Sequence, residues 1–389
     1  MRQVSKPVWM IDPKFKSRYR DFCRSAEFLG GGIDIFQEIT PSHLIYSSLT
    51  TRLSEYFRFL RRKSIKFKIF SNSLRWGFVF NKTPNAYAWK SGGFYCIGIT
   101  SGLIHLLLEA ALRHMADNRV FSCVAFDELN KTTVPITANY LSKYFSHEAP
   151  NEAIYYRHEV YPDNEYRKKC AEALFSLSII FVVMHELGHC LMGHLDSDFF
   201  DVIKEIEGDA EEFHDNRLRM MAEHQADNIA ILITLDNPPP RMQQPGIVLA
   251  EWNALWSISI DMVFWLFCKG PILPHSETRT KHPHPQMRLA HKTLRLLELS
   301  DRVKVNYEDT LGQKINSLGV LGAGLSLQMA KDWTTVGLAL GGWSIFESDE
   351  ILASQIHDLS EFLLGNREIA TKSFKNAKLD IIQELSTIV

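Results

Sequence analysis

The stretch "IIFVVMHELGHCLMGHL", residues 179–195, is an apolar segment interrupted by a cluster of ionisable side chains. His185 and His189 stand four residues apart within it. On a helix this spacing leaves a rotation of about 40°, so both imidazoles leave one face about one turn apart. An apolar helix excludes competing ligands and strengthens the field of a bound ion. The segment therefore predicts a buried helix that carries a metal site.

Glu186 stands between the two histidines and completes the pattern H-E-x-x-H. Its position, about 100° around the helix from His185, lets the carboxylate reach a water on the metal without becoming a ligand. We expect Glu186 to be the general base, which takes a proton from the attacking water and passes it to the leaving amine.

The downstream stretch "MAEHQADNIAILI", residues 221–233, supplies the second half of the predicted site. Glu223 and Asp227 are four residues apart on this predicted helix and share one face. Catalytic zinc typically has three protein ligands and one open position, so Glu223 is expected to join His185 and His189 in binding one Zn²⁺ per chain. We expect Asp227 to accept a hydrogen bond from the far nitrogen of the ligand His185 and so fix its tautomer.

Two other histidines near these ligands are not expected to bind the metal. A metzincin would need glycine at 192 and histidine at 195, but Met192 and Leu195 stand there. His194 comes one residue early and on a continuing helix would point away from His185, so we expect it to contact the terminal carbonyls of the helix. His224 is adjacent to the proposed ligand and falls on the wrong face.

A third motif lies in "KHPHPQMRLAHK", residues 281–292. Pro283 rigidifies the turn that presents His282, and Arg288 follows at the start of the next predicted helix. His282 is a candidate donor to the oxyanion that forms when water attacks a carbonyl, and His284 is its rival. The sequence leaves this choice open.

Composition excludes several other classes. The chain has 389 residues, and its six cysteines form no C-x-x-C pair, which argues against a disulfide framework and a thiolate zinc site. Its net charge is −2, and its basic residues are dispersed apart from "RRK" at 61–63, so nucleic-acid binding is not expected. Nothing in the sequence indicates the oligomeric state.

The apolar segments favour a cytoplasmic protein without a membrane span. The N-terminal residues lack the apolar core of a signal sequence. Residues 247–268 and 317–343 are long and apolar, but both contain ionised side chains, which are costly within a bilayer. We expect both segments to be buried helices.

The pattern along the chain predicts an α+β fold in which helices dominate. The stretch "IKFKIFS", residues 65–71, alternates as a strand does. The runs "WGFVFN", "AYAWK" and "FYCIGIT" indicate a small antiparallel sheet, and helical periodicity begins at residue 101. We divide the chain into an N-terminal helix and strand region (1–80), a catalytic domain (81–300) and a C-terminal helical region (301–389).

The motifs "HELGH", "EHQAD" and "HPHPQMR", in this order, resemble those of gluzincin metallopeptidases. The chain most resembles the Lit family of bacterial phage-exclusion peptidases and, more distantly, HtpX-type peptidases. "PNAYAWKSGGFYCIGITSGL", residues 84–103, is similar to the strand and helix that precede the metal helix in HtpX-type enzymes. The resemblance implies a zincin-like fold with an H-E-x-x-H active-site helix and assigns roles to seven residues: His185, His189 and Glu223 as ligands, Glu186 as base, Asp227 beside a ligand, and His282 and Arg288 as groups that complete the site.

These observations predict a zinc-dependent endopeptidase that acts on a protein or peptide. An extended substrate is expected to pair with an edge strand near residues 86–90. Because Lit-like peptidases act on a translation elongation factor, the resemblance implies a host protein cut during phage defence. Three alternatives remain: an inactive, metal-bound binding or regulatory module, a wholly structural helical protein that needs no metal, and a zinc hydrolase of a non-peptide amide.

Overall fold

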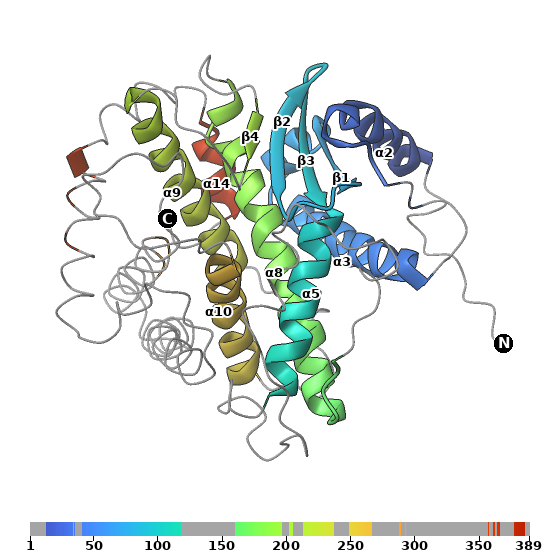
Figure 1. Ribbon diagram of the computed structural model, residues 1–389. Coiled ribbons are helices and arrows are strands. Elements are labelled where there is room, and N and C mark those ends of the chain that lie inside the picture. The colour runs from blue at the N-terminus through green and yellow to red at the C-terminus, as the bar shows by residue number, and fades with distance from the viewer. Residues whose placement is uncertain are drawn as a thin grey trace.

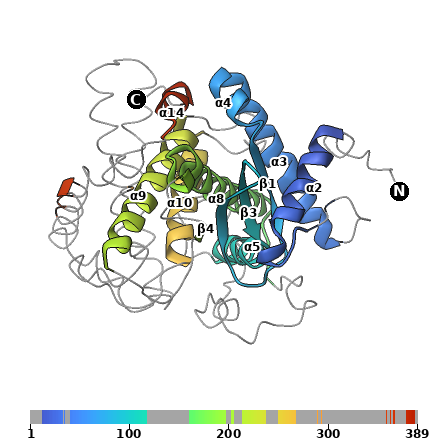
Figure 2. The same ribbon diagram turned by 90° about the horizontal axis from the view of Figure 1, so that it is seen from above.

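The computed structural model describes residues 13–33, 35, 41–117, 160–196, 202–204, 213–236, 249–266, 288, 292, 357, 361, 364, 365 and 377–385. Helix α8 (Glu165–Leu191) runs through the middle, with α9 and α10 on one side of it and a sheet on the other (Figure 1). The same arrangement is visible from above in Figure 2. The other helices are α2 (Pro13–Ser25), α3 (Pro41–Lys63), α4 (Ile65–Phe70), α5 (Ser101–Ala116), α9 (Phe213–Asp236), α10 (Leu249–Leu266) and α14 (Leu379–Leu385), with 3-10 turns η1 (Glu27–Leu29) and η2 (His194–Asp196).

The sheet has four strands in the order β1-β3-β2-β4 and is mixed. Its strands are β1 (Leu74–Val79), β2 (Ala86–Ser91), β3 (Phe94–Thr100) and the three-residue β4 (Val202–Lys204). The hairpin of β2 and β3 turns at Gly92 and Gly93, both with positive φ. This hairpin places β3, rather than β2, beside β1, and the two run parallel. The predicted α+β class is confirmed, and so is the antiparallel pairing of β2 with β3, whereas the expectation of a wholly antiparallel sheet is wrong because β1 runs parallel to β3.

The stretch predicted as a strand at 65–71 is helix α4. Ser64 is its N-cap and accepts a hydrogen bond from the Phe67 amide at 2.9 Å. Phe67 and Phe70, three residues apart, are both buried on one face of the helix. The N-cap and this helical spacing of buried residues stabilise a helix, although lysine alternates with apolar residues as in a strand.

Helix α8 is the core helix of the fold. Asn164 caps its start by accepting from the amides of Tyr166 and Arg167, and all residues from 173 to 191 are buried. Gly193, with φ of 75°, reverses the chain after the helix ends. Among the described helices α8 alone is long and apolar enough to cross a membrane, but its apolar segment is entirely buried in protein, which is weak evidence for a span.

The sequence predicts that two long apolar segments are buried helices, and the structure describes only the first of them. Residues 249–266 of the first form α10, whose apolar part is buried against α8. The second, 317–343, lies outside the described residues.

The buried Arg167 fixes α5 against α8. Its Nε donates to the Met115 carbonyl at 2.5 Å and its Nη2 to the Asp117 carbonyl at 3.1 Å, at the end of α5. These carbonyls would otherwise lack helical partners, so one side chain of α8 both caps α5 and positions it.

Helix α14, far along the chain, packs against α3, α4, α8 and α9. The Lys378 amide donates to the Leu191 carbonyl at 2.7 Å and so caps the end of α8. At the opposite side of α14, Glu384 accepts from the Ser64 hydroxyl at 2.6 Å. The C-terminal residues therefore contact both the N-terminal helices and the core helix. The proposed domain boundaries stay a prediction.

Candidate metal centre

Helices α8 and α9 meet at two small residues. A Cβ built on Gly188 would lie 2.8 Å from the Ala226 Cα and 2.9 Å from its carbonyl oxygen, closer than real Cβ atoms approach. Glycine at this position therefore permits the backbones to touch. Gly188 belongs to the "HELGH" segment and Ala226 to "EHQAD", and this contact brings the functional side chains of the two segments together.

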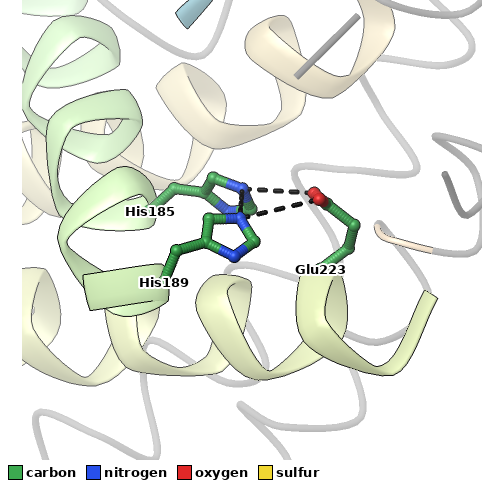
Figure 3. Close-up of side chains that lie close together, drawn as sticks. All are labelled: His185, His189 and Glu223. Atoms are coloured by element: carbon green, nitrogen blue, oxygen red, sulfur yellow. Dashed lines mark hydrogen bonds and ion pairs between the residues drawn. The ribbon is translucent and has the colours of Figure 1, made fainter. Parts of the chain in front are cut away.

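The three predicted ligands converge across this crossing (Figure 3). Nε2 of His185 lies 3.1 Å from Nε2 of His189 and 3.2 Å from a Glu223 carboxylate oxygen. Nε2 of His189 lies 3.6 Å from the other Glu223 oxygen. Ligands at about 2.0–2.1 Å in tetrahedral geometry lie about 3.3 Å from one another, so these separations fit a zinc-sized ion. All three side chains are buried.

His185 is held by a buried ion pair. Its Nδ1 donates to Asp227 Oδ1 at 2.8 Å, which leaves the Nε2 lone pair for a metal. Arg288 donates to both oxygens of that carboxylate, from Nε at 2.8 Å and from Nη2 at 2.7 Å. The guanidinium also stacks over the Phe264 ring, 4.5 Å from its centroid. Arg288 thus contacts the carboxylate that holds His185, and its Nη2 also lies 3.4 Å from His185 Nδ1.

His189 is held by a neutral chain of hydrogen bonds. Its Nδ1 lies 2.8 Å from Nδ1 of His194, and Nε2 of His194 lies 2.8 Å from Oε1 of Gln225. Gln225 accepts the Nε2 proton of His194, and Nδ1 of His194 then accepts from Nδ1 of His189. Burial lowers the pKa of His194 to about 4, so this ring is uncharged at neutral pH.

The expected role of His194 at the helix end is wrong. Helix α8 stops at Leu191, and Gly193 turns the chain back, so the imidazole returns to the ligand instead of continuing around the helix. The glycine directly before His194 was the available signal. Gln225 carried no such signal, because its role depends on where His194 lies.

Glu186 is fully buried, one residue after the first ligand on α8. The nearby thiol of Cys190 donates to the Glu186 carbonyl at 3.4 Å. Burial, followed by the charge of the Glu186 carboxylate, raises the pKa of Cys190 well above its usual value. This thiol therefore stays protonated and is unsuited to bind a metal.

The remaining predicted residues have mixed outcomes. His282 and His284 lie outside the described residues. His224 is buried on α9 and is not part of the group of potential ligands found in the described residues. The expected substrate strand is not an edge, because β2 pairs with β3 on one side and, at residues 87–89, with β4 on the other. The sequence near β2 could not indicate this pairing, because β4 lies more than 100 residues later in the chain.

Comparison with known proteins gives one family match. A family model described as Peptidase U49 matches residues 111–307, about half of the chain. The matched range contains the three converging ligands, Asp227, His194 and Arg288. No curated protein and no solved structure matches the chain.

Proposed function

This chain belongs to the Peptidase U49 family, and from that premise we propose that it is a cytoplasmic, zinc-dependent endopeptidase of the gluzincin type. Family membership supports a peptidase that acts on protein, and the Lit-like resemblance agrees with it. The observation that carries the zinc proposal is the convergence of two imidazole nitrogens and one carboxylate in a buried site. The likeness to HtpX-type enzymes and a role in phage defence stay predictions.

The donor set suits zinc more than a hard cation. Two imidazoles and one carboxylate form the His₂Glu set of catalytic zinc sites, whereas calcium and magnesium favour oxygen ligands. Each histidine has its Nδ1 engaged, by Asp227 or by His194, so both Nε2 atoms are preset for a metal. Zinc, when bound there, would lower the pKa of a water and polarise the scissile carbonyl.

Glu186 provides the acid–base chemistry in this proposal. It shares α8 with both ligand histidines but is absent from the group of converging ligands, as expected of a general base. Its carboxylate takes a proton from the attacking water and returns it to the leaving amine, which requires one residue to act as base and then as acid. The buried surroundings exclude bulk water from this transfer.

Replacement of Glu186 by glutamine tests the proposal. Glu186→Gln keeps the size and the three ligands, so zinc content and thermal stability should stay within error of wild type. Activity should fall by a factor of about 10² to 10⁴. Metal analysis of the purified proteins and comparison of new protein N-termini in cells expressing either form measure both effects.

Glu172→Gln is the matched control, because it makes the same change on an exposed position of α8. It should cleave as wild type does. Loss of zinc in the Glu186 variant would make this residue a ligand or a structural support. Equal numbers of new N-termini from both forms would mean that another residue is the base. An absence of new N-termini in cells expressing wild type would favour an inactive binding module, and hydrolysis of small amides alone would favour the non-peptide hydrolase.

A further inference from the structure

A cavity of about 310 Å³ lies between α2, α3 and the start of β1. Both ribbon views place α2 on the side of the sheet away from α9 and α10 (Figures 1 and 2). All residues that line it precede the range matched by the peptidase family. None of the converging ligands of the metal centre lines the cavity, so a role for the cavity goes beyond the proposed peptide hydrolysis.

The lining of this cavity is strongly basic. It contains no aspartate or glutamate but five cationic side chains: Lys14, Arg18, Arg58, Arg61 and Arg75. The whole chain, in contrast, has a net charge of −2. Burial first, and then the nearby positive charge of Arg18, lowers the pKa of Arg61. An anion between these two guanidinium groups would have the opposite effect.

Arg75 and Arg18 of the lining are positioned by hydrogen bonds to uncharged groups. Arg75 is 7% exposed, and its Nη1 donates to the carbonyls of Asn72 and Leu74. Its buried Nε makes no hydrogen bond within the described residues but lies 3.9 Å from an Asp21 carboxylate oxygen, a long ion pair, and its guanidinium lies 3.9 Å from the centroid of the Phe94 ring. Arg18 donates to the Asn72 side chain at 3.1 Å.

Three arginines of the lining lack an acidic partner within the described part of the chain. Arg18, Arg58 and Arg61 form no ion pair with a carboxylate of the described residues. Surface arginines without an acidic partner are usually hydrated by bulk water. Arg18 on α2 and Arg61 on α3 are instead partly buried, and both line the same cavity. Guanidinium groups so arranged match the oxygens of a phosphate, which they bind in pairs.

Aromatic rings form another part of the same wall. Phe57 and Trp76 stack with their centroids 5.6 Å apart, and Phe15 meets Trp76 edge-on at 5.9 Å. All three line the cavity, and Trp76 is only partly buried. A flat ring could therefore lie against Trp76 while an attached phosphate reaches the arginines.

We propose that this cavity binds a phosphorylated small molecule with an aromatic ring, of the nucleoside diphosphate class. Arg18, Arg61 and Arg75 hold the phosphates, and Trp76 contacts the ring. The volume is at the lower end of the range for small-molecule sites, which fits one mononucleotide better than a longer polymer.

Calorimetry on the full chain at low salt tests the proposal, with ADP as the probe and with pyrophosphate and adenosine as its two halves. ADP should bind more tightly than either half. Arg18→Gln with Arg61→Gln should weaken ADP binding by at least about tenfold, since each lost charge-assisted bond typically costs that much. Trp76→Leu should weaken ADP but leave pyrophosphate unchanged.

Arg20→Gln with Arg62→Gln is the matched control, because it removes the same charge from exposed neighbours outside the cavity lining. It should bind ADP as wild type does. Arg58→Gln, at an exposed position of the lining, gives a second test if the first double variant fails to fold.

Three results would overturn the assignment. The first is an absence of ADP binding to wild type at about 1 mM, the weak limit of specific affinity. The second is pyrophosphate binding as tight as that of ADP, which would remove the ring from the ligand. The third is a single-stranded RNA that binds more tightly than ADP and loses affinity in the same variants, which would make the cavity part of a nucleic-acid surface. Peptidase activity enters none of these measurements.

Discussion

The two histidine ligands share one helix but are supported by different chemistry. His185 donates to Asp227, a carboxylate clamped by Arg288, whereas His189 contacts the neutral pair of His194 and Gln225. Hydrogen bonds to a charged group are roughly twice as strong as neutral ones. We therefore expect the charged support, Asp227 with Arg288, to hold His185 more strongly than the neutral support, His194 with Gln225, holds His189. The charged support fails if either Asp227 or Arg288 is lost, whereas the neutral support adds no charge to the buried site.

The largest expected effect comes from removing the carboxylate of the charged support. Asp227→Ala leaves Arg288 buried without its partner, which typically costs about 3–5 kcal/mol of unfolding free energy. His185 also loses its acceptor, so zinc affinity should fall about 10- to 100-fold while binding persists. Denaturant unfolding and competition with a zinc chelator measure the two quantities.

A double variant separates these two effects. Asp227→Ala with Arg288→Met removes the unpaired charge and should recover most of the unfolding free energy, whereas zinc affinity should stay low. Zinc affinity equal to wild type in the single variant would exclude Asp227 from the support of His185.

A smaller effect is expected from breaking the neutral support. His194→Leu removes the acceptor for Nδ1 of the buried His189 and the donor to the partly buried Gln225 carbonyl. An unsatisfied buried polar group costs about 1–3 kcal/mol, below the loss expected for Asp227→Ala. Zinc affinity should fall by about tenfold, the lower limit for such partners, in the same chelator competition. A loss equal to that of Asp227→Ala would show that charge is not the source of the difference.

The smallest loss of zinc affinity is expected from changing Gln225, which is hydrogen-bonded to His194 and not to a ligand itself. Gln225→Leu keeps His194 against His189 but removes the group that fixes its tautomer. We expect a loss of about threefold in zinc affinity, which corresponds to the lower part of the range for one neutral hydrogen bond. If this variant weakened zinc more than His194→Leu does, the order of the chain from ligand to glutamine would be wrong.

Sequence reasoning succeeded where the geometry is local. Residues four apart on one helix share a face whatever the remaining fold does, so the spacing within "HELGH" and within "EHQAD" predicted which side chains could meet. The helical, α+β character followed from periodicity for the same reason. The convergence of His185, His189 and Glu223 is the spatial outcome of two such local patterns and one close helix crossing.

The remaining features depend on contacts between distant segments. The parallel pairing of β1 with β3 and the coverage of β2 by β4 are set by tertiary packing, which no local pattern encodes. Arg288 reached Asp227 across 61 positions, and its motif did not indicate that target. The basic cavity combines Arg58 and Arg61 of α3 with cationic side chains of α2 and β1, so its charge appears dispersed along the sequence.

The bond between Lys378 and Leu191 sets an order of events during synthesis. The ribosome makes α8 early and the residues of α14 after every other described element. At about 5–20 residues per second, the interval from residue 191 to residue 378, a difference of 187 residues, lasts roughly 10–40 s. Throughout that time the helix that holds two of the three ligands lacks the amide that closes its end. The residue that caps this helix is therefore synthesised after all three ligands of the site.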